Sequence, residues 1–84
     1  MRVSRRDYKI IASALSAARR RANLTQVELA ARLRKPQSFV SDYERGQRRV
    51  DIAEFVVIAQ TLGAEPIEIL NEILATLPRS VRIR

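Results

Sequence analysis

The apolar residues of this 84-residue chain recur three or four positions apart along most of its length. In the first stretch, Tyr8, Ile11, Leu15 and Ala18 follow this spacing, with Arg and Ser residues between them. Such a period places apolar side chains on one face of a helix, whereas a strand alternates at every second residue. The pattern predicts an all-α fold of five helices, at about residues 7–22, 25–33, 36–44, 51–62 and 66–77.

Residues that begin or end helices lie between these stretches. Thr25, with Glu28 three residues later, forms a capping-box pattern in which each side chain accepts a hydrogen bond from a free backbone N–H. Pro36 suits the first position of a helix because its φ is already helical. Asn23 and Gly46 tolerate the left-handed conformation that ends many helices. The other expected boundary residues are Asp51, Gly63, Pro66 and Pro78.

The chain is long enough for one compact domain but not for two. We therefore expect residues 1–84 to form a single domain. Arg2, Arg5 and Arg6 precede the first predicted helix and predict a flexible basic arm over residues 1–6. Residues 79–84 alternate apolar and basic positions without a partner strand, which predicts a flexible tail.

Charge and composition narrow the class of function. Sixteen Lys and Arg residues against nine Asp and Glu residues give a net charge of +7, which favours a polyanionic partner. The chain has no His and no Cys, so Cys/His zinc sites, disulfides and imidazole catalysis are excluded. We expect a protein that is not an enzyme and needs no metal and no cofactor. No apolar run reaches the length of a signal peptide or a membrane span, so we expect a cytoplasmic protein without a membrane partner.

Two short predicted helices, 25–33 and 36–44, are joined by a very short turn and have the dimensions of a helix-turn-helix. The segments Leu-Thr-Gln-Val-Glu-Leu-Ala at 24–30 and Ser-Phe-Val-Ser-Asp-Tyr-Glu-Arg-Gly at 38–46, followed by Leu62-Gly63, resemble the Cro and repressor (XRE-type) family of lambdoid phages. The resemblance covers about residues 10–74 and implies a five-helix, lambda-repressor-like DNA-binding domain. The turn departs from many members, because Arg34-Lys35-Pro36 stand where those have a Gly and a small apolar residue.

The helix at 36–44 is the expected reader of the DNA major groove. Gln37 is our first candidate for base reading, because a glutamine amide can pair bidentately with adenine, which is worth about 1–3 kcal/mol of discrimination. Ser38, Ser41 and Asp42 complete the expected base-reading set. For Asp42 we favour pairing with a neighbouring Arg, and Phe39 either meets a thymine methyl group or covers the edge of the core.

Several residues around this helix are expected to contact DNA phosphates. Thr25 and Gln26 stand at the start of the helix at 25–33, where free N–H groups and the helix dipole favour an anion. The cations of the turn and of the loop after the reading helix are the other candidates, namely Arg34, Lys35, Arg45, Arg48 and Arg49. Arg19 and Glu44 match a pair that forms an internal salt bridge in the family, so the resemblance implies that role for them.

A freestanding regulator needs two reading helices roughly 34 Å apart, which requires a dimer on a palindromic operator of double-stranded DNA. The helix at 66–77 has more apolar residues than one small core can cover, so we expect a homodimer interface at Ile67, Ile73, Leu74 and Leu77. The alternative is that this excess packs against the helix at 7–22.

The sequence points to a dimeric transcriptional repressor and leaves three alternatives open. These are an antitoxin that represses its own operon and binds a toxin, a controller of a restriction-modification system, and a protein-interaction module without DNA binding. The short tail argues against a toxin-binding segment. The polar and basic groups gathered around one helix argue against a pure protein-interaction module.

Overall fold

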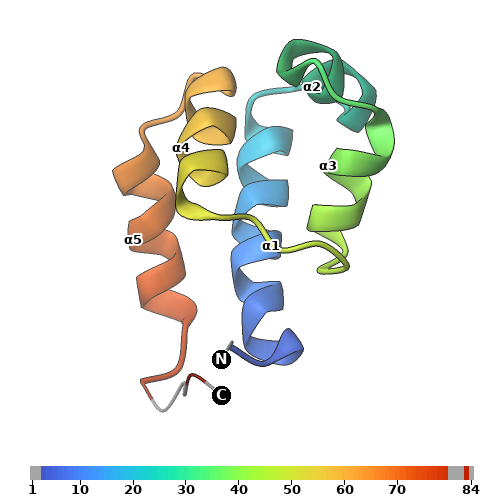
Figure 1. Ribbon diagram of the computed structural model, residues 1–84. Helices are drawn as coiled ribbons and strands as arrows, with labels where there is room; N and C mark the ends of the chain where they lie inside the picture. The colour runs from blue at the N-terminus through green and yellow to red at the C-terminus, as the bar shows by residue number, and fades with distance from the viewer. Residues whose placement is uncertain (1–2, 80–82, 84) are drawn as a thin grey trace.

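The computed structural model describes residues 3–79 and 83, and it confirms the all-α prediction. Five helices follow one another along the chain (Figure 1): α1 Arg5–Arg21, α2 Gln26–Leu33, α3 Gln37–Glu44, α4 Ile52–Thr61 and α5 Pro66–Thr76. The described residues contain no strand. Each observed helix lies within one or two residues of its predicted range, which is the usual uncertainty of helix ends.

Polar side chains fix the start of three helices. The predicted capping box of α2 is present, because Thr25 accepts a hydrogen bond from the Glu28 N–H and Glu28 accepts one from the Thr25 N–H. A second capping box, formed by Asp51 and Glu54, begins α4. At α1 the cap is Ser4, whose hydroxyl accepts from the Asp7 N–H at 3.2 Å.

The Ser4 cap corrects the predicted basic arm. Because the cap lies at residue 4, the first turn of α1 contains Arg5 and Arg6, whereas the sequence pattern predicts a flexible arm over residues 1–6. Arg2 lies outside the described residues, as do positions 80–82 and 84 of the predicted tail. The flexibility of the two termini therefore stays a prediction.

The first four helices end in the same way. A residue with positive φ follows each of them, at Asn23, Arg34, Gly46 and Gly63. The residue after it donates its N–H to a carbonyl five positions earlier, as in the bond of 3.0 Å from Lys35 to Ala30. This is the Schellman arrangement, which satisfies carbonyl groups that the helix leaves free. At the α2–α3 turn a residue with a Cβ, Arg34, adopts this left-handed conformation. This follows from the turn sequence, which has Arg34-Lys35-Pro36 where many family members have a Gly.

α1 packs against α3 on one side and α5 on the other, and α4 lies against both α5 and α2 (Figure 1). Every helix contributes to one apolar core. The largest fully buried side chains are Leu15, Leu29, Val40, Tyr43, Ile58 and Ile69. Val40 and Tyr43 are the buried residues of α3, and their burial fixes which face of that helix points to solvent.

Candidate nucleic-acid interface

The solvent-facing side of α3 carries the four residues predicted to read bases. Gln37 and Ser38 are exposed at the start of the helix, and Ser41 and Asp42 are half-buried one turn later. The Ser41 hydroxyl donates to the Ser38 carbonyl at 3.4 Å, and Asp42 pairs with Arg45 at 2.8 Å. The preferred interpretation of Asp42, pairing with a neighbouring Arg, is therefore confirmed. The structure brings the four residues to one face, and their contacts with bases stay a prediction.

Glu44, at the end of α3, binds three side chains from two other helices. Its carboxylate accepts from the Arg19 Nε at 2.7 Å and from the Arg19 Nη2 at 3.0 Å, which makes the predicted salt bridge bidentate. Ser16 donates to the same carboxylate at 3.2 Å, and Gln26 does so at 3.0 Å. Glu44 thus ties α1 and the start of α2 to the end of α3.

The Glu44 carboxylate is held in its charged form although its side chain is only 5% exposed. Burial by itself raises the pKa of Glu44, but the hydrogen bonds from Arg19, Gln26 and Ser16 and the charge of Arg19 outweigh it and leave the pKa below 4.5. The same carboxylate raises the pKa of Arg19, chiefly through their hydrogen bonds. The pair is therefore ionised at neutral pH.

The two glutamines of the interface are linked to this network. Because the Gln26 amide nitrogen is bound to Glu44, its carbonyl oxygen is free to accept from the Gln37 Nε2, at 3.4 Å. Sequence reasoning gave these residues separate roles and missed the link. The signal was present in the pattern, since Gln26 and Gln37 are the first residues of two helices joined by a short turn.

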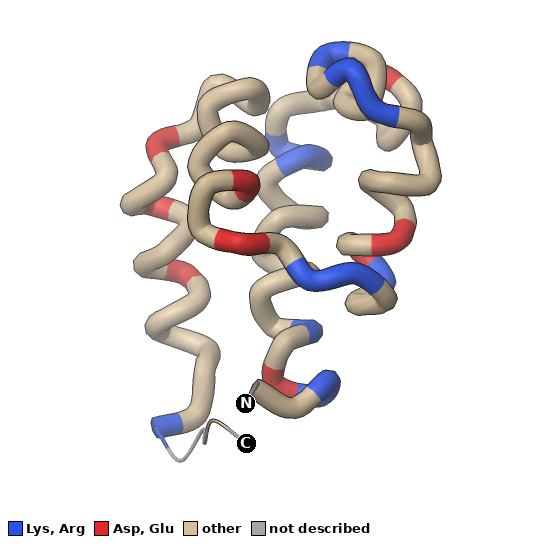
Figure 2. The backbone as a smooth tube through the Cα atoms, viewed as in Figure 1, with Lys and Arg blue, Asp and Glu red and all other residues tan. Residues whose placement is uncertain are grey.

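The predicted phosphate-binding cations fall into two groups. Arg34 and Lys35 are exposed at the α2–α3 turn, where Figure 2 shows adjacent basic positions. Arg45 is exposed at the end of α3 and paired with Asp42. The other two cations, Arg48 and Arg49, lie in the loop between α3 and α4 and are half-buried.

The side chains of Arg48 and Arg49 contact other residues of the chain. Arg48 pairs with Glu54 at 2.7 Å and lies over the Phe39 ring, 4.6 Å from its centroid. Arg49 lies 4.8 Å from the centroid of Tyr8 and donates to the Val3 carbonyl at 2.7 Å. These contacts hold the loop against α1 and α4, a structural role that the charge pattern did not indicate. Thr25 likewise has a structural role, as the cap of α2.

Phe39 covers the edge of the core. Its ring is half-buried and meets Tyr43 edge-on, with ring centroids 5.6 Å apart. It packs against the buried cluster beside α4, which is one of the two placements that the sequence left open.

The predicted dimer residues of α5 do not all lie on one surface. Ile67 and Leu74 are 59% and 63% exposed, as a contact surface requires. Ile73 is buried in the core of its own chain, because that position faces α1, and Leu77 packs against the same core. Assigning Ile73 to a free interface was wrong, and the assignment of the partly buried Leu77 stays a prediction. Leu70, 40% exposed and spaced i+3 from Ile67, was missed and belongs to the exposed face instead.

The described residues, 3–79 and 83, contain no group of three acidic, His or Cys side chains that could hold a metal ion. Within the same part of the chain, no helix is both long and apolar enough to cross a bilayer.

Comparison with known proteins places this arrangement in a family. Residues 15–70 match the helix-turn-helix family. The chain is 34% identical over 63 residues to an uncharacterised HTH-type transcriptional regulator, y4dJ, of Sinorhizobium fredii, covering 75% of this chain and 82% of that protein. It resembles the structure of an XRE-family like protein from Pseudomonas syringae, with 42% identity and a TM-score of 0.76 over 86% of this chain and 88% of that one. The restriction-modification controller protein C.AhdI from Aeromonas hydrophila is also similar, with 32% identity and a TM-score of 0.68 over 75% of this chain and 96% of that one. The chain therefore belongs to the Cro/repressor (XRE-type) helix-turn-helix family of DNA-binding transcriptional regulators.

Proposed function

We propose that the protein is a homodimeric repressor that binds a palindromic operator and reads bases in the major groove with α3. The observation that carries this proposal is the position of Gln37. Its side chain is exposed at the first residue of α3, and its amide is oriented through Gln26 by the buried Glu44 carboxylate. A side chain held in advance loses less entropy when it meets a base than a free one does.

The surroundings of Gln37 supply the electrostatic part of the proposal. Arg34 and Lys35 at the turn, and Arg45 at the end of α3, are exposed cations close to the proposed reading face. They contact phosphates, with Gln26 at the N-terminus of α2. Arg48 and Arg49 contribute less to phosphate binding, because both are engaged with Glu54, Phe39, Tyr8 or Val3.

The exposed apolar face of α5 is the proposed dimer interface. Ile67, Leu70 and Leu74 are spaced i, i+3 and i+7, so they lie along one side of the helix. Ile52 at the start of α4 is 80% exposed, and it shares the lining of a surface groove with Leu70. Ile73 lines the same groove but is only 5% exposed, so it offers little area to a partner.

The DNA proposal is tested by binding to the upstream region of the gene and to a scrambled duplex, over a salt series. Wild type is expected to prefer the upstream DNA. Gln37→Ala is expected to lose about 1–3 kcal/mol of that preference while its salt slope is unchanged, because the phosphate contacts remain. Gln60→Ala removes an exposed glutamine of α4, outside the helix-turn-helix, and is the matched control. It is expected to bind like wild type.

Two results would contradict the proposal. Absence of binding to either duplex at low salt would exclude a DNA-binding role and favour the protein-interaction module. Unchanged preference in Gln37→Ala would remove that residue from base reading.

The dimer is tested by sedimentation. Leu74→Glu places a charge in the proposed interface and is expected to yield monomers with weakened operator binding. Val57→Glu changes another exposed apolar residue, on α4, and is expected to leave the dimer intact. A monomeric wild-type protein would refute the interface.

A controller of a restriction-modification system is the second candidate, supported by the similarity to C.AhdI. The two roles differ in the genes that the operator precedes. Mapping protected sites near the gene distinguishes them, since a controller requires a site that governs a restriction or modification gene.

A further inference from the structure

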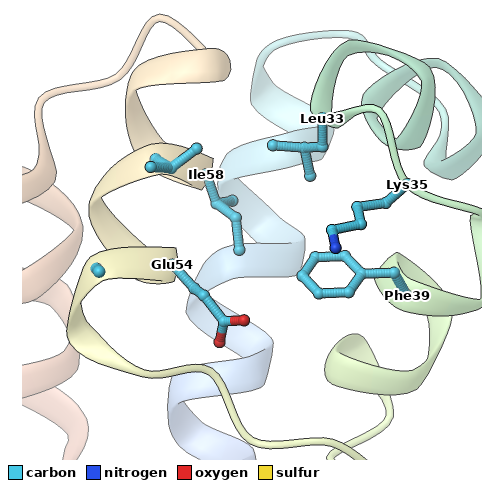
Figure 3. A pocket seen from close by; sticks show the side chains of 7 residues that line it. Leu33, Lys35, Phe39, Glu54 and Ile58 are labelled. Carbon is cyan, nitrogen blue, oxygen red and sulfur yellow. The ribbon is translucent and has the colours of Figure 1, made fainter.

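A small apolar cavity lies between the α2–α3 turn and α4 (Figure 3). Its volume is about 210 Å³, and its apolar walls are formed by Leu33, Phe39, Ala53, Val57 and Ile58. Ala53 and Val57 are exposed residues, so the cavity can be reached from solvent. An apolar cavity of about 150 Å³ is enough to bind benzene, whereas drug-sized ligands need roughly 300 Å³ or more. The cavity therefore has the size of a single-ring ligand.

The charged groups at the cavity favour an anion. Lys35 extends over the Phe39 ring, with its Nζ 5.7 Å from the ring centroid, and Glu54 stands across from it (Figure 3). Both oxygens of Glu54 are already engaged, by the Arg48 guanidinium and by the Asp51 N–H. Within the described part of the chain, Lys35 has no carboxylate within salt-bridge distance. Among the residues that line the cavity, Lys35 is the cation and Glu54 the carboxylate, and Glu54 already pairs with Arg48, which is outside the lining.

We propose that this cavity binds a small aromatic carboxylate, with the ring against Phe39, Val57 and Ile58 and the carboxylate paired with Lys35. The apolar walls remove the ring from water, and the ammonium group supplies the polar contact that orients the ligand. Burying an uncharged ring alone would leave Lys35 without a counter-ion, whereas a cationic ligand would be repelled by it.

The site also connects ligand binding to DNA binding, a consequence that rests on the proposed function of Lys35. A carboxylate paired with Lys35 competes with a DNA phosphate for the same ammonium group. Because coupling between two ligands is reciprocal, the carboxylate is expected to weaken DNA binding and DNA is expected to weaken carboxylate binding.

The site is tested on the whole chain without DNA, by titrating benzoate and following the methyl NMR signals of Leu33, Val57 and Ile58. Benzamide has the same ring without the charge. Benzoate is expected to shift these signals saturably, and benzamide is expected to bind about three- to fivefold more weakly, the effect of one exposed ion pair. Lys35→Gln is expected to remove this difference between the two ligands.

A second variant tests the cavity itself. Ala53→Leu fills the space from an exposed position and is expected to abolish saturable shifts, whereas Ala31→Leu, at an exposed alanine of α2 outside the cavity lining, is expected to retain them. Equal binding of benzoate and benzamide to wild type would overturn the pairing with Lys35. Absence of saturable shifts in wild type would overturn the site. Both outcomes are independent of DNA binding, so failure here is distinct from failure of the repressor proposal.

Discussion

Replacing Glu44 by glutamine keeps the shape of the side chain but removes the charge that Arg19, Gln26 and Ser16 surround. The wild-type carboxylate accepts four hydrogen bonds, two of them from Arg19. An amide at the same place has one accepting oxygen, and its NH₂ group faces donors. Arg19, whose side chain is 13% exposed, then loses its counter-charge and at least one of its two bonds to residue 44, and it keeps its bond to the Leu24 carbonyl.

The expected cost follows from this burial. Removing one partner of a buried ion pair destabilises by about 3–5 kcal/mol, and we expect about 3 kcal/mol because Arg19 retains some contact with water. For a chain of 84 residues the total stability is roughly 4–13 kcal/mol. Glu44→Gln is thus expected to lower the Tm by more than about 12 °C.

Urea and thermal unfolding, followed by circular dichroism, measure this loss. Glu72→Gln is the matched control, because its ion pair with Arg21 is solvent-exposed, with side-chain exposures of 45% and 55%. It is expected to cost less than about 1 kcal/mol. Arg19→Met in the Glu44→Gln background removes the uncompensated charge and is expected to recover part of the stability. A loss below about 1 kcal/mol in Glu44→Gln, or additive effects of the two substitutions, would refute the reasoning.

The same contact predicts a dependence on pH. Because the folded-state pKa of Glu44 lies below its ordinary value of 4.5, ionised Glu44 contributes its full stabilisation above pH 4.5. That contribution is lost as the pH falls through the lower pKa of the folded state. The stability difference between wild type and Glu44→Gln is therefore expected to narrow in acid, as measured by urea unfolding at a series of pH values. A constant difference would contradict the linkage.

Four further substitutions, one of them a control, test local features by urea unfolding. The Tyr43 hydroxyl is buried without a hydrogen-bond partner among the described residues, so Tyr43→Phe is expected to stabilise by about 1 kcal/mol, and a loss would indicate a bound partner. Arg34 has φ +58°, so Arg34→Gly is expected to gain about 0.5–1 kcal/mol by relieving backbone strain. Gly63→Ala is the reverse control, because a Cβ at this position meets no atom within 4 Å. Its expected loss of about 1 kcal/mol of stability therefore comes from the positive φ alone. If both variants were as stable as wild type, the argument from backbone strain would be refuted. Ser4→Ala is expected to cost about 1 kcal/mol through loss of the α1 cap, and unchanged stability would show that the cap is dispensable.

The sequence alone determined the number, order and approximate bounds of the helices. Capping boxes, Schellman ends and the period of apolar residues act over at most five positions, so neighbouring residues reveal them. The start of α1 was the exception, because Ser4 caps the helix four residues before Tyr8, the first residue of the apolar period. The resemblance of residues 24–30 and 38–46 to a known family added the Arg19–Glu44 pair and the expectation that α3 is the recognition helix.

The tertiary structure decided how distant residues combine. Glu44 joins Ser16, Arg19 and Gln26, which lie 18 to 28 positions away in the chain, and it thereby orients Gln37. On α5 the apolar residues exceed what one face holds, so composition could not separate the buried Ile73 from the exposed Leu70. Their placement depends on the rotation of α5 against α1 and α4. That rotation is set by the packing of the whole core, to which every helix contributes, and it leaves no local pattern in the sequence.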